Sequence, residues 1–444
     1  MMVYLSYHLQ RCAYGLRRWL GQQFTPMGLG VLVCLGITAI AGLGSIQSLM
    51  HLVFFLALAL LLVAFLGRCT LRYAVRASRS LPPFGTVGEV LYYPVVLQNL
   101  TPTPQSGLKL VESLPEPFPS FREFQDLRQR YRNRYQRRSQ WRRYLAKGRW
   151  ALAPRVDLPP LSARQKTEVT GKILPLRRGR LQLPALALLC PDPLGLLYRR
   201  QTCPIAQSVC ILPQRYQIPP LNLPNLRTYQ PGEAVITSAV GESLEFRSLR
   251  DYRPGDPSNT IHWKSWAKLG RPVVKEQQEE TALHHGLILD TFQTQTQSDL
   301  FEAAIAIAIS ILTQEQAEAT LMDVMLAAPK PRYWTVGQGR SQQLRILETL
   351  ATLLPCPVQT LHGLMPLVQA RLPHLSGCLC ILLSDDETRY LFVEQLVRHQ
   401  IPTKVILLGD SWVYPQDRFD RFRSDLCQIH FVALSQLQQD LLQL

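Results

Sequence analysis

A short segment between residues 249 and 264 carries the most distinctive combination of polar and aromatic side chains in the chain. Pro254 and Gly255 suit the two central positions of a type II turn, where proline fixes φ and glycine supplies a positive φ. Asp256 follows the turn and is placed for a fixed hydrogen bond or ion pair. The motif comprises Arg250, Asp251, Tyr252, Pro254, Gly255, Asp256, Ile261, Trp263 and Lys264.

Several cations lie close to this aspartate in the sequence. We expect Arg250, Arg253 or Lys264 to be its partner. We also expect Ile261 and Trp263 to alternate inward like residues at the edge of a strand. Two interpretations remain open: a rigid polar turn pinned by an aromatic side chain, or a surface on which another protein docks.

A second group of charged side chains lies between Pro119 and Trp150, where eleven Arg or Lys residues accompany only Glu123 and Asp126. Aromatic residues recur there at helical spacing, which is typical of a cationic amphipathic helix. Such a helix packs on its own domain, lies on anionic lipid, or binds acidic protein or nucleic acid without reading bases. The residues expected to contact an anionic surface are Arg128, Arg130, Arg132, Arg134, Arg137, Arg138, Arg142 and Arg143.

Sequence motifs for catalysis are missing. The segment Gly337 to Ser341 lacks the spacing and the lysine of a phosphate-binding loop. His284 and His285 would point to opposite faces of a strand. The sequence has no nucleophile elbow, zincin helix or paired-cysteine cage. We therefore expect no enzyme activity, no catalytic residue and no cofactor.

Two long apolar runs lie near the N-terminus, ahead of the segments that carry the charged and aromatic groups described above. Residues 27–46 contain no Asp, Glu, Lys or Arg, and residues 49–67 form a second uncharged run. Each run has about the length that spans a bilayer as a helix, so we predict a transmembrane hairpin within residues 1–80. The alternative is a cleaved signal peptide, which leaves the second run unexplained.

Basic residues flank both sides of this hairpin, and neither flank contains an acidic residue. They are Arg11, Arg17 and Arg18 before it and Arg68, Arg72, Arg76 and Arg79 after it. The positive-inside bias places both ends in the cytoplasm. We therefore expect a multi-pass protein of the bacterial inner (plasma) membrane whose soluble domains face the cytoplasm, where its ten cysteines stay reduced.

The soluble part is predicted to be multidomain. Residues 81–215 show the alternation of a β-sandwich-like domain, with the basic helical insertion at 119–150. Residues 216–285 carry the motif. From 286 to 444 apolar strands alternate with amphipathic helices, which is typical of an α/β domain. We expect strands at 286–290, 321–326, 378–384, 404–408 and 429–434, and helices at 298–316, 342–354 and 388–399.

The motif resembles the hallmark of the domain of unknown function 58 family, which is an Arg-Glu-Tyr-x-Pro-Gly-Asp run followed by Ile-x-Trp and a basic segment. The likeness extends to the turn Asp192-Pro193-Leu194-Gly195-Leu196, the membrane hairpin and the α/β domain, and it leaves out the Arg-rich insertion. Asn259 and the run Trp266-Ala267-Lys268 depart from the family's pattern. These departures bear on the local ion-pair network.

This resemblance implies a von Willebrand factor A-like fold for residues 286–444 and an AAA ATPase of the MoxR kind as partner. Such domains often bind Mg²⁺ through Asp-x-Ser-x-Ser after the first strand. Here the stretch is Asp290-Thr291-Phe292-Gln293-Thr294, in which Phe292 cannot be a ligand, and Asp385 or Asp386 is the second carboxylate available. The degenerate metal site would comprise Asp290, Thr294 and Asp385, and we expect a metal-free fold.

These observations lead to two hypotheses. The first is a membrane-anchored, non-catalytic scaffold or adaptor that acts with a MoxR-type AAA ATPase in the assembly or maturation of protein complexes. The alternative is a membrane-tethered protein that binds anionic lipid or nucleic acid, without sequence specificity, through the Arg-rich insertion.

Overall fold

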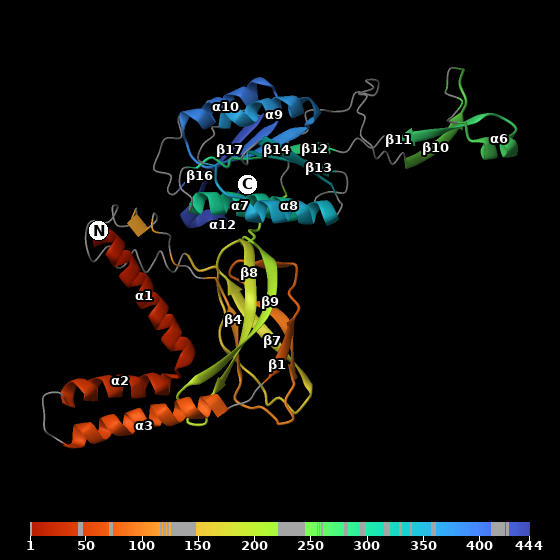
Figure 1. The fold of residues 1–444 in the computed structure, drawn as a ribbon. Helices are drawn as coiled ribbons and strands as arrows, with labels where there is room; N and C mark the ends of the chain where they lie inside the picture. The colour runs from red at the N-terminus through yellow and green to blue at the C-terminus, as the bar shows by residue number, and fades with distance from the viewer. Residues whose placement is uncertain are drawn as a thin grey trace. The chain divides into compact units, whose positions relative to one another are not determined.

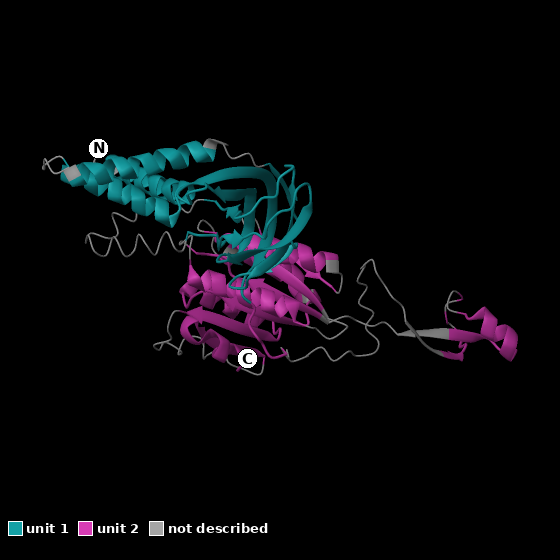
Figure 2. Ribbon diagram, turned by 90° about the horizontal axis from the view of Figure 1, so that it is seen from below, with its two compact units in different colours: residues 1–214 teal, residues 215–444 magenta. Residues whose placement is uncertain are grey.

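The chain divides into two compact units, residues 1–214 and 215–444 (Figure 2). The computed structural model describes residues 2–42, 48–70, 74–115, 118, 121, 124–125, 148–220, 245–254, 256, 258, 261–278, 283–293, 298–314, 320–327, 331–337, 340–356, 361–409, 422 and 426–444. Each unit has an apolar core of its own, so the protein is multidomain, as the sequence predicts.

Three helices open the first unit: α1 (Met2–Gln23), α2 (Pro26–Gly42) and α3 (Ser48–Thr70). Thr25 caps α2, because its Oγ1 accepts a hydrogen bond from the backbone N–H of Gly28 at 3.0 Å. Pro26 occupies the first helical position, where a missing N–H costs nothing. Helix α1 has no counterpart among the sequence predictions.

Among the described residues, one helix is long and apolar enough to cross a membrane, Leu49–Arg68 within α3. Little of this helix is buried inside the protein. The apolar helix α2 is shorter, with 17 residues. The predicted first span ends at residue 46, and residues 43–47 lie outside the described ones. The structure thus contains one membrane-helix candidate near the N-terminus, and the two-span hairpin stays a prediction.

Two sheets form the rest of the first unit. One has the strand order β1-β3-β7-β5, with β1 (Val75–Arg79), β3 (Leu91–Asn99), β7 (Lys166–Pro175) and β5 (Ala151–Leu152). The other has the order β2-β9-β8-β4-β6, with β2 (Phe84–Thr86), β9 (Tyr198–Leu212), β8 (Gly179–Pro191), β4 (Lys109–Ser113) and β6 (Val156–Asp157). Alternate side chains of both sheets fill one apolar core.

A buried ion pair joins these two sheets. The Nη1 atom of Arg79 in β1 lies 2.5 Å from Oε2 of Glu112 in β4, and the two side chains are 0% and 3% exposed. Tyr93 donates its hydroxyl to Glu112 at 2.7 Å, and Arg79 donates to Gln207 and to the carbonyl of Leu183. Arg79, which the sequence assigns to the membrane flank, is therefore buried in protein.

The second unit contains a six-stranded sheet with the order β14-β13-β12-β15-β16-β17 (Figure 1). Its parallel strands are β12 (Leu283–Leu289), β13 (Thr320–Ala327), β15 (Gly377–Leu382), β16 (Thr403–Gly409) and β17 (Cys427–Ala433), and β14 (Pro331–Val336) runs antiparallel to β13 at one edge. Pairing across the sheet thus joins segments far apart in the sequence.

Helices cover both faces of this sheet. Figure 1 shows α7 (Asp299–Thr313), α8 (Arg340–Thr352) and α12 (Leu437–Leu441) on one face, and α9 (Met365–Arg371) and α10 (Glu387–Arg398) on the other. Short 3-10 turns occupy Leu361–Leu364, Leu372–His374 and Leu434–Gln436. The predicted α/β alternation is confirmed, and every strand and helix predicted between 286 and 444 is present near its expected position. Strand β14 and helix α9 were not predicted.

The second unit also contains an antiparallel pair of strands, β10 (Glu245–Asp251) and β11 (Val273–Gln278). The connection between them contains helix α6 (Trp263–Leu269). This hairpin and its connection carry the sequence motif.

Candidate functional site

The motif lies at the end of the β10–β11 hairpin. In the ladder, Arg250 is opposite Val274 and Asp251 is opposite Val273. Ile261 forms a further antiparallel bridge with Val274. After β10 the chain pairs with β11 again at Ile261 and then enters α6. The connection is therefore fastened to the hairpin at both ends.

Asp256 is fixed by a two-pronged ion pair. Arg250 donates from Nη1 to Oδ2 and from Nη2 to Oδ1, each at 2.7 Å, and the backbone N–H of Arg253 donates to Oδ2 at 2.8 Å. The hydrogen bonds from Arg250 and Arg253 lower the pKa of Asp256 to about 2. The predicted ion pair is confirmed, with Arg250 as the partner, whereas Lys264 lies exposed on α6. Gly255 lies outside the described residues, so the type II turn stays a prediction.

The other polar residues of the connection are more exposed. Arg271 donates to Asp251 at 2.9 Å, and because both side chains are exposed this pair contributes little to stability. The N–H of Tyr252 donates to the carbonyl of Pro272 at 3.0 Å, and Pro254 is exposed. The described residues of the connection are therefore held mainly by the bidentate pair and the backbone hydrogen bonds.

Trp263 does not lie at a strand edge, so that part of the prediction is wrong. It opens helix α6, is 63% exposed and stacks on Trp266, with ring centroids 5.2 Å apart and planes at 19°. Residues three apart on a helix share a face, which brings the two rings together. The helix ends at Gly270, whose φ of 69° is left-handed. Trp266 was not predicted, although the Trp-x-x-Trp spacing signals it.

We define the motif surface as Trp263, Trp266 and Leu269 together with Lys264 and Lys268. Leu269 and both lysines are exposed on α6. Exposed aromatic side chains on a rigid element are typical anchors of protein interfaces, and nearby cations favour acidic partners. The chemistry of this surface suits recognition of an acidic protein partner.

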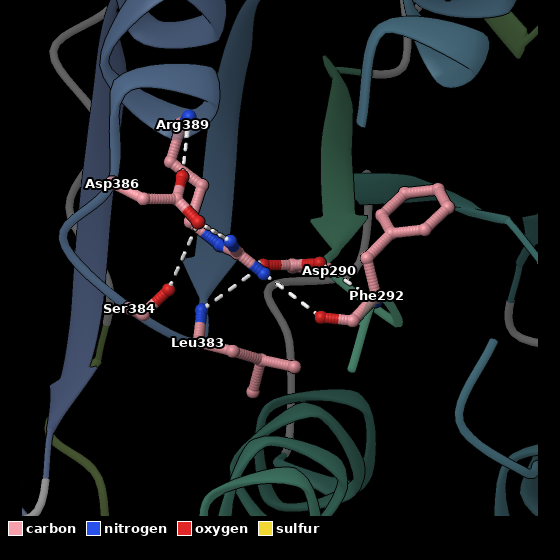
Figure 3. A network of polar contacts seen from close by, with 6 residues as sticks. All are labelled: Asp290, Phe292, Leu383, Ser384, Asp386 and Arg389. Atoms are coloured by element: carbon pink, nitrogen blue, oxygen red, sulfur yellow. Dashed lines mark hydrogen bonds and ion pairs between the residues drawn. The ribbon is translucent and has the colours of Figure 1, made fainter. Parts of the chain in front are cut away.

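A second arrangement lies at the carboxyl ends of strands β12 and β15. These strands are neighbours in the sheet, and the order of strands reverses between them, since β13 lies on one side and β16 on the other. Sheets of this kind bind ligands in the crevice at such a reversal. The segments after these two strands supply the polar groups shown in Figure 3.

Asp290 is held there by protein donors on both of its oxygens. Oδ1 accepts from the N–H of Phe292 at 2.9 Å, and Oδ2 accepts from the N–H of Leu383 at 3.1 Å and from Nε of Arg389 at 2.6 Å. Arg389 also donates to the carbonyl of Phe292 at 2.9 Å and forms an ion pair with Asp386 (Figure 3). The side chain of Asp290 is fully buried.

Helix α10 positions the arginine. Asp386 is its N-cap, and Oδ1 accepts a hydrogen bond from the backbone N–H of Arg389 at 3.0 Å. The hydroxyl of Ser384 approaches Oδ2 of the same carboxylate at 3.4 Å. The cap therefore fixes both the start of the helix and the place from which Arg389 reaches Asp290.

The guanidinium of Arg389 lies against Oδ2 of Asp290, at 2.6 Å from Nε. Burial raises the pKa of Asp290, and the charge of Arg389 opposes that change. Of the degenerate metal set, Thr294 lies outside the described residues, and Asp386 rather than Asp385 joins the network. Within the described ranges, no group of three or more His, Cys, Asp or Glu side chains is placed to hold a metal ion.

The turn between β8 and β9 is built around a buried carboxylate. Asp192, which is 3% exposed, accepts from the N–H of Leu194 at 3.0 Å and from the N–H of Leu197 at 2.5 Å. Gly195 takes a φ of 68°, which favours glycine. This turn is the Asp-Pro-Leu-Gly-Leu segment singled out in the sequence.

That turn is fastened to the N-terminal helices. The N–H of Thr25 donates to the carbonyl of Leu196 at 2.9 Å, and the Thr25 hydroxyl donates to the carbonyl of Gly195 at 2.6 Å. A Cβ at Gly28 would lie 1.9 Å from the Leu196 oxygen, so α2 approaches the turn at a distance that only glycine allows. Leu196 also packs with Ala64 of α3. Hydrogen bonds and close packing therefore fasten the β domain to α2 and α3 at this turn.

The arginines expected to contact an anionic surface, from Arg128 to Arg143, lie outside the described residues. Their helical arrangement and their binding role stay predictions. Near the start of the insertion, Phe118, Phe121 and Phe124 pack around Tyr7 of α1, with ring centroids 5.3 to 5.7 Å apart.

Comparison with known proteins identifies one family. Residues 248–369 match the family model described as "Protein of unknown function DUF58". The matched segment begins in β10 and ends in α9. This segment includes the motif and Asp290, and it ends before Arg389. The resemblance drawn from the motif is thus supported over this part of the chain. No curated protein matches the chain.

Two solved structures of the CARDB domain of a Pyrococcus furiosus protein are similar to part of the chain. Each is 10% identical in sequence, and they cover 31% and 32% of this chain and 94% and 89% of their own. The second is a crystal structure of that domain in complex with di-metal ions. Their TM-scores are 0.19 and 0.18, so neither likeness carries an argument about fold or function.

Proposed function

We propose that this chain is a membrane-anchored, non-catalytic adaptor whose motif surface docks an AAA ATPase of the MoxR kind during the assembly or maturation of protein complexes. The observation that carries the proposal is the exposed Trp263, stacked on the partly buried Trp266, on a connection held by Arg250 and Asp256. Aromatic side chains on rigid elements lose little conformational entropy on binding, and they dominate the energetics of many interfaces.

For the six-stranded sheet, the proposal includes a von Willebrand factor A-like fold. In chain order its strands lie third, second, first, fourth, fifth and sixth across the sheet, and the third is antiparallel. In this proposal the Arg389 guanidinium takes the place of the Mg²⁺ that such domains often hold beside the aspartate after the first strand. The domain then needs no metal ion, the contact with the ATPase is made by the motif surface, and nucleotide hydrolysis is left to the ATPase.

The proposed location is the inner membrane, with α2 and α3 as a two-span hairpin and the soluble units in the cytoplasm. The length and apolar surface of α3, the apolar α2 beside it and the composition of residues 1–88 support this proposal. Those 88 residues contain no Asp or Glu, so every charged side chain in and around the hairpin is basic.

Photo-crosslinking tests the adaptor proposal. A photoreactive phenylalanine derivative is placed at Trp263 in full-length protein, and membranes are irradiated with ATP, with ADP and without nucleotide. We expect a crosslinked product that contains the MoxR-type ATPase in at least one nucleotide state. The same derivative at Leu354, which is 74% exposed and outside the motif surface, is the matched control and should give none. Absence of the ATPase at position 263 in all three states contradicts the proposal.

A further inference from the structure

Helix α1 exposes a continuous apolar stripe. Its members are Leu5, Leu9, Cys12, Leu16 and Trp19, all exposed, with Leu5 and Leu9 at 63%. Their spacing of four, three, four and three residues keeps them within an arc of about 80° on an α-helix. Such a narrow, exposed apolar face is typical of a helix that lies against another surface.

Away from the stripe, α1 contacts the rest of the first unit at Tyr7 and at Gln22. Tyr7 is 7% exposed and lies within aromatic contact of Phe121 and Phe124. Near the end of the helix, Arg200 of β9 donates to the side chain of Gln22 at 2.5 Å. These contacts fix the rotation of α1 about its axis, so the apolar stripe points away from the β domain.

The charges around the stripe select the partner. Arg11 and Arg17 are exposed and lie about 120° to either side of the stripe on the helix. Helix α1 contains no acidic residue, and the first one in the chain is Glu89. A seam between the stripes of two copies of the chain would run for only about two heptads, which is too short for a stable coiled coil, and it would leave the arginines without an acidic partner on α1. An anionic lipid surface satisfies both the apolar stripe and the arginines.

The stripe is continuous with the apolar helices. Helix α1 ends at Gln23 and α2 begins at Pro26. Between them, the ring of Phe24 lies 6.3 Å from that of Trp19 and packs against the cluster formed by Ala64 of α3 and the β8–β9 turn. Trp19 therefore lies at the end of the stripe nearest to the proposed spans, where tryptophan is enriched in membrane proteins.

We propose that α1 is a second, non-spanning membrane contact that lies on the anionic leaflet. Leu5, Leu9, Leu16 and Trp19 reach the boundary between headgroups and acyl chains, and the arginines remain among the headgroup phosphates. This inference rests on the proposed membrane anchor and adds a surface to it. Because α1 is also fastened to the β domain, the contact holds that domain in a fixed orientation against the leaflet.

Fluorescence quenching by brominated lipids tests this inference. Full-length protein is reconstituted in vesicles of phosphatidylcholine and phosphatidylglycerol whose acyl chains carry bromine near the headgroup or near the chain end. The difference between wild type and Trp19→Phe isolates the emission of Trp19. We expect quenching by bromine near the headgroup, and we expect Leu9→Asp to lose it. Gln10→Asp also introduces one carboxylate at an exposed position of α1, but outside the stripe, and it should keep the quenching.

Retention of the same samples in alkaline carbonate separates this inference from the anchor. Protein that stays on the vesicles while Trp19 is quenched by aqueous iodide and not by brominated lipid overturns the role of α1 and leaves the anchor standing. Protein that washes off overturns both. Efficient Cys12–Cys12 crosslinking on mild oxidation, with no lipid quenching of Trp19, assigns the stripe to a second copy of the chain and overturns the lipid contact.

Discussion

The substitution Arg389→Met removes the charged one of the three hydrogen-bond donors that the described residues supply to Asp290 at the strand reversal. Asp290 is fully buried, so the variant leaves an uncompensated carboxylate inside the protein. Breaking a buried pair by removal of one partner costs about 3–5 kcal/mol. In a unit of this size, each kcal/mol shifts Tm by roughly 2–4 °C, so we expect the unfolding transition of the second unit to fall by roughly 6–20 °C.

Differential scanning calorimetry of the full-length protein in detergent measures this shift, with Arg398→Met as the matched control. Arg398 lies on the same helix and pairs with Glu394 at 2.7 Å, but its side chain is 72% exposed. The free energy lost in that control should stay below about 1 kcal/mol. Arg79→Met should lower the Tm of the first unit instead, so calorimetry of this variant identifies which transition belongs to that unit.

A double variant sharpens the test. Asp290→Asn combined with Arg389→Met removes both charges, and it should lose less stability than Arg389→Met alone because no unpaired ion stays buried. A shift in Arg389→Met no larger than that of Arg398→Met would refute the reasoning. It would mean that Asp290 is solvated or neutral, and that the arginine does not stand in for a cation.

Three further outcomes follow from the structure. Gly28→Ala should destabilise the first unit by about 1–3 kcal/mol in calorimetry, because its Cβ would lie 1.9 Å from a carbonyl oxygen of the β8–β9 turn, whereas Gly30→Ala, with nothing within 4 Å, should not. Burial raises the pKa of Cys378 to about 12, so maleimide at pH 9 should label exposed Cys12 and spare Cys378 in native protein, as read by mass spectrometry. The pKa of Asp256 is about 2, against an ordinary 3.8, so its ion pair stabilises the hairpin fully above pH 4. This stabilisation is lost as pH falls toward 2. Tryptophan fluorescence should show the loss, and Asp256→Asn should abolish the pH dependence.

Short-range sequence patterns were enough to predict most of the α/β elements and the ion pair of Asp256. Apolar strand runs and amphipathic helices are short-range signals, and they located the elements between 286 and 444 other than β14 and α9. The Arg250–Asp256 pair joins residues six positions apart across a turn, so it was within reach of sequence reasoning. The Asp290–Arg389 pair spans 99 positions and depends on which strands are neighbours, which the sequence does not state. Its only local signal is an N-cap aspartate followed three residues later by arginine.

The errors also have physical causes. Ile261 and Trp263 are two residues apart, which favours a strand, but Trp263 and Trp266 are three apart and Gly270 follows as a helix stop. The longer pattern was the informative one. Arg79 looked like part of the basic membrane flank because it follows an apolar run, yet it ends β1 and is buried between the two sheets of the first unit. Helix α1 escaped prediction because its stripe alternates with tyrosine, histidine and arginine and never forms a continuous apolar run.

Binding of the ATPase to the motif surface is the central claim, and its affinity for full-length protein in nanodiscs is the most direct measurement. An aromatic anchor contributes about 2 kcal/mol or more, so we expect Trp263→Ala to weaken the Kd for the MoxR-type ATPase roughly 30-fold or more. Leu354→Ala, a comparable truncation at an exposed site outside the motif surface, should bind like wild type. Equal affinity of wild type and Trp263→Ala, or no binding to wild type, would contradict the account.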